Sequence, residues 1–234
     1  MNNFSQHASI HAVLFDLDGT LLDTAPDLTL ALNKLLKSRN KEAIALDDAR
    51  NHVSQGAAAV TRLGFPEVAD EMEFEQLRLE FLRYYAENIC IESALFPGMN
   101  ELINRIEETD TPWGIVTNKP AWLTEPLLDE LSLSIRASCI VSGDTTEMRK
   151  PHPEPLLYAC EMMNLAPDNT IYVGDDPRDI YAGNAAGMYT CVAKFGYIDP
   201  TLDTESWGAD FSIDSPTELL KFINLSKPIN DFKS

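Results

Sequence analysis

Short apolar runs alternate with helix-period patterns along most of this 234-residue chain. The runs are rich in Val, Ile and Phe, which is typical of strands buried on both faces of a parallel sheet. They occupy residues 11–16, 113–117, 139–142, 170–173 and 189–193, with a weaker sixth at 209–213. Helical patterns lie between them at residues 99–108, 124–131, 153–163 and 179–186. The alternation predicts βαβ units and a three-layer α/β core, with an open parallel sheet between two layers of helices.

One long segment interrupts this alternation. Residues 24–93 contain no convincing strand and carry apolar residues at helical spacing. Thr24 is typical of a helix start, with a capping hydroxyl, an early proline after it and an acid, Asp27, in the first turn. We therefore expect an all-helical cap of residues 24–93, inserted into a core domain formed by residues 1–23 and 94–234.

Composition limits the partners that the chain can bind. The 37 Asp and Glu residues exceed the 18 Lys and Arg residues, and the net charge of -19 repels nucleic acid and anionic lipid. No signal peptide and no apolar run of about 18 residues is found, and the four cysteines lack metal-ligand spacing. We expect a cytoplasmic monomer or homodimer that binds neither nucleic acid nor membrane, with a frayed end at residues 227–234. Any phosphate site must carry its own cations.

Two carboxylates follow the first predicted strand. Asp16 and Asp18 are two residues apart at the strand end, so both can converge on one site, and Gly19 lets the chain turn closely beside them. An acidic turn would also explain this pair taken alone. Each later strand end, however, carries a polar residue suited to phosphate chemistry, which favours a catalytic site.

Those later strand ends supply donors, a cation and more carboxylates. Thr117 and Asn118 offer a hydroxyl and backbone N–H groups to phosphate oxygens, and Lys150 lies in a proline-rich turn as a local cation. The fourth strand is followed by three further carboxylates: Asp175, Asp176 and Asp179. One carboxylate from each of two strand ends suits a hard divalent ion such as Mg²⁺.

In this order, the DLDGT run at residues 16–20, Thr117, Lys150 and the GDD run with its following Asp at residues 174–179 resemble all four motifs of the haloacid dehalogenase superfamily. The resemblance covers the whole chain, and the helical insertion is similar to the family's type C1 cap. It implies a Rossmann-like core and a phosphoric monoester hydrolase. Asp18 favours phosphoryl transfer over dehalogenation, because a halide leaving group needs no proton.

The resemblance also implies a role for each motif residue. Asp16 attacks phosphorus and becomes an aspartyl-phosphate, while Asp18 protonates the leaving alkoxide and then activates water. Mg²⁺ is held by the Asp16 carboxylate, the Asp18 backbone carbonyl and Asp175.

The remaining motif residues bind the phosphate or support the site. Thr117, the Asn118 N–H and Lys150 hold the phosphate oxygens. Asp176 and Asp179 orient either Lys150 or a metal-bound water, and the motifs do not decide which acid matters more.

Longer segments narrow the implied substrate to a small phosphorylated metabolite. The runs at residues 18–27, 117–120, 142–145 and 149–157 resemble phosphoglycolate phosphatases and the bacterial N-acetylmuramic acid 6-phosphate phosphatases of peptidoglycan recycling, and are closer to the latter. A sugar phosphomutase of the same superfamily stays an alternative. A phospho-accepting signalling module is a second alternative, but it would lack the cap and an acid at the position of Asp18.

Two loops beside the site follow from the same resemblance, and two hinges follow from the connectivity of the chain. Family members place a specificity loop at the position of residues 54–56 and a further loop beside the site at residues 194–197; a solvated loop and a simple turn are the alternatives. We expect hinges for cap movement at residues 22–24 and 93–96.

Overall fold

The computed structural model describes residues 10–223, so the frayed end expected at residues 227–234 lies outside it. Its centre is a six-stranded sheet in the order β5-β4-β1-β6-β7-β8, in which every neighbouring pair is parallel. The strands are β1 (Ala12–Phe15), β4 (Trp113–Val116), β5 (Cys139–Val141), β6 (Thr170–Gly174), β7 (Tyr189–Ala193) and β8 (Phe211–Ile213). All six predicted strands are therefore confirmed, including the weaker sixth one.

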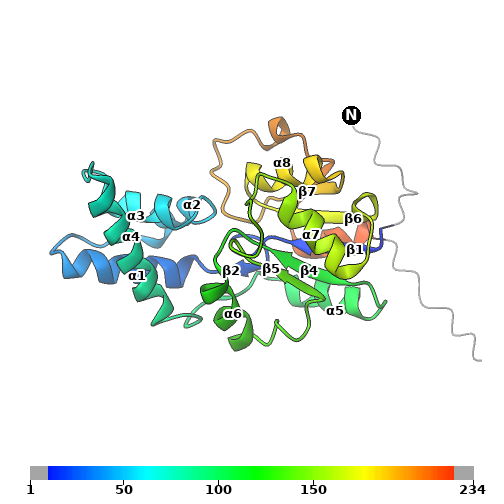
Figure 1. Ribbon diagram of the computed structural model, residues 1–234, viewed down its shortest axis with the longest axis horizontal. Coiled ribbons are helices and arrows are strands. Elements are labelled where there is room, and N and C mark those ends of the chain that lie inside the picture. The colour runs from blue at the N-terminus through cyan, green and yellow to red at the C-terminus, as the bar shows by residue number, and fades with distance from the viewer. Residues whose placement is uncertain (1–9, 224–234) are drawn as a thin grey trace, which may run out of the picture.

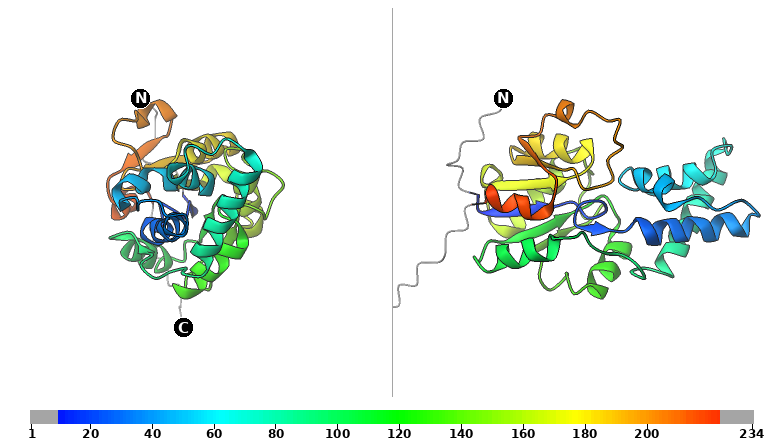
Figure 2. Two further views of the ribbon diagram at one scale, coloured as in Figure 1. Left: turned by 90° about the vertical axis from the view of Figure 1, so that its left-hand side faces the viewer. Right: turned by 180° about the vertical axis from the view of Figure 1, so that it is seen from behind.

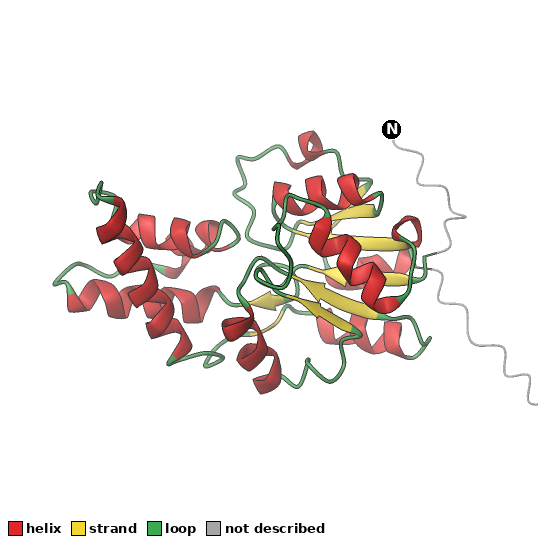
Figure 3. Ribbon diagram, in the orientation of Figure 1, coloured by secondary structure: helices red, strands yellow, loops and turns green. Residues whose placement is uncertain are grey.

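Helices cover both faces of this sheet (Figures 1 and 3). They are α5 (Met99–Glu107), α6 (Ala121–Glu130), α7 (Glu154–Met163) and α8 (Pro177–Ala186), with short 3₁₀ turns at η1 (Pro167–Asn169), η2 (Thr204–Trp207) and η3 (Pro216–Lys221). Alternate side chains of β1 enter different apolar clusters: Val13 and Phe15 pack with residues of α5 and α6, whereas Leu14 packs with residues of α7 and α8. The strand is thus buried on both faces, and the Rossmann-like three-layer core is confirmed.

The position of β1 explains where a site can form. The chain runs from β1 outward to β4 and β5 on one side, and through β6 to β7 and β8 on the other. The order reverses beside β1, and in open α/β sheets ligands bind at the carboxyl ends of the strands at such a point.

The segment between β1 and β4 is helical, as predicted. Its helices are α1 (Ala25–Ser38), α2 (Leu46–Val53), α3 (Ala57–Gly64) and α4 (Glu71–Ala86). They lie together beyond the end of the sheet at which β1 finishes (Figure 2). The buried leucines of α1 pack with Leu77 and Phe81 of α4 in one apolar cluster. Among residues 10–223, none of the helices is long and apolar enough to cross a membrane.

A short antiparallel ladder of β2 (Leu22–Asp23) and β3 (Ala94–Leu95) joins the two ends of this helical segment. The expected hinges and the expected boundaries of the cap fall at this ladder, and the division into two domains stays a prediction. One detail of the predicted helix start is wrong. Thr24 is the N-cap of α1, but its hydroxyl makes no capping hydrogen bond and instead donates to Asp18 Oδ1 at 2.5 Å.

Candidate active site

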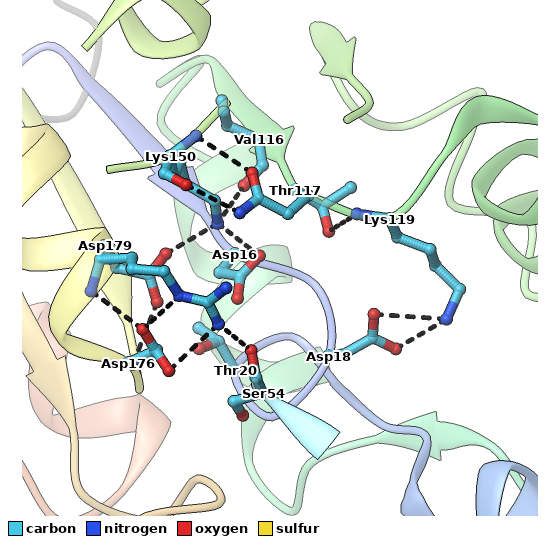
Figure 4. Close-up of polar contacts among 12 residues, drawn as sticks. Asp16, Asp18, Thr20, Ser54, Val116, Thr117, Lys119, Lys150, Asp176 and Asp179 are labelled. Atoms are coloured by element: carbon cyan, nitrogen blue, oxygen red, sulfur yellow. Dashed lines mark hydrogen bonds and ion pairs between the residues drawn. The ribbon is translucent and has the colours of Figure 1, made fainter. Parts of the chain in front are cut away.

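Three predicted site carboxylates and the predicted lysine meet where β1 and β6 end. Figure 4 shows Asp16, Asp179 and Lys150 of this group. Asp16 directly follows β1, Asp175 directly follows β6, and Asp179 lies in the first turn of α8. One oxygen atom from each of these buried carboxylates lies within 4.8 Å of the other two. Lys150 Nζ is 2.8 Å from Asp16 Oδ1 and 2.7 Å from Asp179 Oδ1. The parallel strands therefore bring together residues that are far apart in sequence.

The Lys150 ammonium is buried among oxygen atoms. Besides the two carboxylates, it donates to the Val116 carbonyl oxygen at 3.0 Å and to the Tyr172 hydroxyl at 2.7 Å. Burial disfavours the charged form, but Asp16 and Asp179 outweigh that effect and raise the pKa of Lys150. Lys150 is therefore a permanent cation in this site, as the acidic chain requires.

The Asn118 side chain holds the backbone that carries this lysine. Its Nδ2 donates to the Lys150 carbonyl oxygen at 3.0 Å, and its Oδ1 accepts from Lys150 N at 3.1 Å. Sequence reasoning considered only the backbone N–H of Asn118. The side-chain role follows from tertiary contact between two loops, which no local pattern reports.

The carboxylate cluster is short of positive charge. Burial, helped by Asp179 and opposed by Lys150, raises the pKa of Asp16 to about 7. Burial and the neighbouring Asp16 and Asp179 carboxylates raise the pKa of Asp175 well above its usual range. When all three acids are ionised, Lys150 balances only one of them, and two negative charges remain. A buried set of carboxylate oxygens with this charge fits a hard divalent cation.

Asp175 is fixed by donors from three separate segments. Thr20 Oγ1 donates to Asp175 Oδ1 at 3.0 Å, while Ser54 Oγ and the Tyr197 N–H donate to Oδ2 at 2.7 Å and 2.8 Å. Ser54 belongs to the α2–α3 loop and Tyr197 follows β7. The two loops that the family resemblance marked, residues 54–56 and 194–197, therefore both reach this carboxylate.

Two glycines allow these close approaches. Gly19 has φ +89°, and a Cβ atom there would lie 2.3 Å from Asp175 Oδ2. A Cβ atom on Gly196 would lie 2.4 Å from Asp175 Cβ and 2.3 Å from the Gly19 carbonyl oxygen. All three distances are far below van der Waals contact, so neither position accepts a side chain without displacing Asp175.

Asp18 lies outside the carboxylate cluster and pairs with a cation that sequence reasoning left without a role. Lys119 Nζ is 2.9 Å from Asp18 Oδ1 and 3.3 Å from Oδ2 (Figure 4). Burial disfavours the Lys119 ammonium, but the Asp18 carboxylate and the nearby Tyr85 outweigh it and raise the pKa of Lys119. The Tyr85 ring of α4 lies over this ammonium, with its centroid 4.4 Å from Nζ. The only sequence signal was the position of Lys119, two residues after Thr117.

The two remaining acids have different neighbours. Asp179 accepts from Lys150 and from the Asp176 N–H, whereas Asp176 caps α8 and pairs with Arg178, whose Nε lies 2.8 Å from Asp176 Oδ1. Arg178 also donates to the Ser54 carbonyl oxygen. Of the two acids left undecided by the motifs, Asp179 is thus the one that contacts the lysine.

A cavity of about 640 Å³ opens over these residues. Its walls include Asp16, Asp18, Thr117, Asn118 and Lys150 from the sheet end, together with side chains from α3, α4 and α6. Thr117 is buried, and its hydroxyl accepts from the Lys119 N–H at 3.1 Å.

Comparison with known proteins agrees with this geometry. The model of the family described as haloacid dehalogenase-like hydrolase matches residues 13–193. The chain is 42% identical over 215 residues to an N-acetylmuramic acid 6-phosphate phosphatase of Pseudomonas putida, covering 92% of this chain and 96% of that protein. It is 41% identical over 208 residues to a phosphoglycolate phosphatase of Xanthomonas campestris, covering 89% and 94%.

A solved structure shares the whole architecture. The crystal structure of a predicted phosphoglycolate phosphatase from Haemophilus somnus superposes with a TM-score of 0.81 and 28% identity, over 93% of this chain and 98% of that one. The family match spans both the strand that precedes Asp16 and the strand that precedes Asp175. This chain therefore belongs to the haloacid dehalogenase-like hydrolase family.

Proposed function

We propose that this protein hydrolyses the phosphomonoester of a small metabolite, with Asp16 as nucleophile and Mg²⁺ as cofactor. The observation that carries the proposal is the buried cluster of Asp16, Asp175, Asp179 and Lys150, which lacks two positive charges and borders an open cavity. Such a cluster attracts both a divalent cation and the phosphoryl group that accompanies it.

The reaction proceeds in two displacements. An Asp16 oxygen forms a bond to phosphorus while the bond between phosphorus and the leaving alkoxide breaks, and Asp18 gives a proton to that alkoxide. Asp18 then accepts a proton from a water whose oxygen attacks phosphorus, which releases inorganic phosphate and restores Asp16. Lys150, Thr117 and the Asn118 N–H hold the non-bridging oxygens through both steps.

The Asp16 and Asp175 carboxylates and the Asp18 backbone carbonyl would hold Mg²⁺. Asp179 belongs to the same carboxylate cluster and accepts from Lys150, Tyr172 and the Asp176 N–H. When bound, the cation offsets the repulsion between an anionic nucleophile and an anionic phosphate. Asp179 then acts by holding Lys150 in place.

The size and lining of the cavity favour N-acetylmuramic acid 6-phosphate over 2-phosphoglycolate. A volume of about 640 Å³ falls within the range of roughly 300–1,000 Å³ that holds drug-sized ligands. Leu79, Leu82 and Trp122 add an apolar wall suited to a sugar ring. 2-Phosphoglycolate stays the second candidate, because the relative from Xanthomonas is nearly as similar as the one from Pseudomonas. The cytoplasmic location and the monomeric or dimeric state stay predictions.

Phosphate release tests the proposal. We expect Mg²⁺-dependent release of inorganic phosphate by the wild type and a loss of about 1,000-fold or more in kcat for Asp16→Asn. Asp168→Asn, at an exposed position, is the matched control and should behave as the wild type. Full activity of Asp16→Asn would overturn the nucleophile assignment. A higher kcat/KM for 2-phosphoglycolate than for N-acetylmuramic acid 6-phosphate would reverse the substrate preference.

A further inference from the structure

The cations that line the cavity differ in whether their charge is already balanced. Four of the five are paired with carboxylates: Lys150 with Asp16 and Asp179, Lys119 with Asp18, Arg178 with Asp176, and Arg78 with Glu75. The fifth is Arg149. Within residues 10–223, its exposed guanidinium has no ion pair and no hydrogen bond.

An unpaired arginine is notable in this protein because of the protein's charge. The chain carries a net charge of -19, so an available carboxylate is far more common on it than a free cation. Arg149 nevertheless lines the cavity beside Lys150, which directly follows it in the chain. Its charge is therefore available to a ligand in the cavity.

The chemistry of the ligand group follows from what the site already provides. The transferred phosphoryl group has Lys150, Thr117 and the proposed cation as partners, so a further free guanidinium suits a second negative charge on the same molecule. A planar guanidinium binds a carboxylate through two parallel hydrogen bonds. Trp122, which is half exposed in the same cavity, offers a flat apolar face to the carbon skeleton between the two anions.

We propose that Arg149 binds a carboxylate on the leaving group, and that the enzyme thereby selects phosphomonoesters of organic acids. This inference rests on the proposed phosphatase function and names a specificity residue for it. Both candidate substrates carry such a carboxylate, on the lactyl ether of N-acetylmuramic acid 6-phosphate and directly on 2-phosphoglycolate.

Matched substrate pairs isolate the carboxylate. N-acetylglucosamine 6-phosphate lacks only the lactyl group of the muramic acid compound, and 2-hydroxyethyl phosphate replaces the carboxylate of 2-phosphoglycolate by a hydroxymethyl group. For the better-hydrolysed pair, we expect the wild type to prefer the acid by kcat/KM. Arg149→Met should reduce this preference by about 10- to 100-fold, as expected for losing a charge-assisted hydrogen-bonded pair. Arg149→Lys keeps the charge but loses the two parallel hydrogen bonds of a guanidinium. Its preference for the acid should therefore lie between those of the wild type and Arg149→Met.

Arg78→Met is the control, because Arg78 lines the same cavity but is neutralised by Glu75. Its preference ratio should stay within about twofold of the wild type. An equal ratio for Arg149→Met and the wild type, a wild type with no preference for the acid, or an equal loss on both members of the pair would each overturn the inference. The last outcome would mean that Arg149 contacts the phosphate. No phosphate release from either pair by the wild type would instead contradict the proposed function.

Discussion

Lys119 shows how one buried side chain can position the acid that we propose as general acid and base. Its side chain is only 6% exposed, and its ammonium, with the Thr24 hydroxyl, fixes the Asp18 carboxylate. The same ammonium lies under the Tyr85 ring of α4. The proposed general acid and base is thus held by one group from the sheet end and another from the start of the helical segment.

Replacing Lys119 by Met should leave Asp18 without its cation. We expect kcat to fall by about 10- to 100-fold, since the Asp18 carboxylate is no longer positioned. The free energy of unfolding should fall by about 1–3 kcal/mol, because a carboxylate that is only 16% exposed loses its ion pair. Phosphate release and urea denaturation measure the two effects.

Asp18→Asn provides the matched background for this change. If the two side chains interact as the structure shows, Lys119→Met should cost less stability in Asp18→Asn than in the wild type. Equal losses in both backgrounds would mean that Lys119 acts independently of Asp18.

Among the elements, α1 has a second function besides packing. Asp27 in its first turn is fully buried and accepts hydrogen bonds from the N–H groups of Ile91, Glu92 and Ser93, at 2.9 to 3.1 Å. The Ser93 hydroxyl donates to the same carboxylate at 2.7 Å. One side chain therefore ties the end of the helical segment to its beginning, next to the β2–β3 ladder.

Replacing Asp27 by Ala should strongly destabilise the protein. Three backbone donors and one hydroxyl would lose their acceptor, so we expect the free energy of unfolding to fall by about 2–4 kcal/mol in urea denaturation. Ser93→Ala removes one donor only and should cost about 1 kcal/mol. A midpoint of urea unfolding for Asp27→Ala equal to that of the wild type would mean that other contacts hold the two ends of the helical segment together.

For the molecule as a whole, we expect the carboxylate cluster to couple stability to pH and to the proposed Mg²⁺. Between pH 3.8 and about 7, folded Asp16 keeps a proton that the unfolded chain has already released. The folded state then binds more protons, so the contribution of Asp16 to stability is lost as pH rises through this window. The raised pKa of Asp175 acts in the same direction.

The metal-free protein should therefore lose thermal stability, relative to Asp16→Asn, as pH rises from about 4 to about 7. Mg²⁺ should raise the Tm more at the higher pH, where it does not compete with protons, and more for the wild type than for Asp16→Asn. Thermal unfolding in EDTA and in saturating Mg²⁺ measures both effects. A pH-independent difference between the two proteins would show that Asp16 does not retain its proton.

Much of the fold was predictable because its signals are local. All six predicted runs form strands. Five are largely buried, since a strand buried on both faces needs only a short continuous run of apolar residues, whereas β8 lies at the sheet edge and is partly exposed. Helix starts were less accurate. The helix predicted from residue 124 begins at Ala121. The one predicted from residue 179 begins at Pro177, because Asp176 is its N-cap and forms a local capping box with Asp179.

The sequence by itself determined that each motif follows a strand, and therefore that Asp16, Lys150 and Asp175 could meet at one sheet edge. Parallel strands end at the same edge, so this convergence needs no knowledge of side-chain packing. Only the tertiary structure decided which charges are paired and which are free. Lys119 meets Asp18 across 101 residues, Ser54 meets Asp175 across 121, and Arg149 meets no carboxylate within residues 10–223. Ion pairing depends on distances between side chains from different elements, and the periodicity of residues along the chain does not predict those distances.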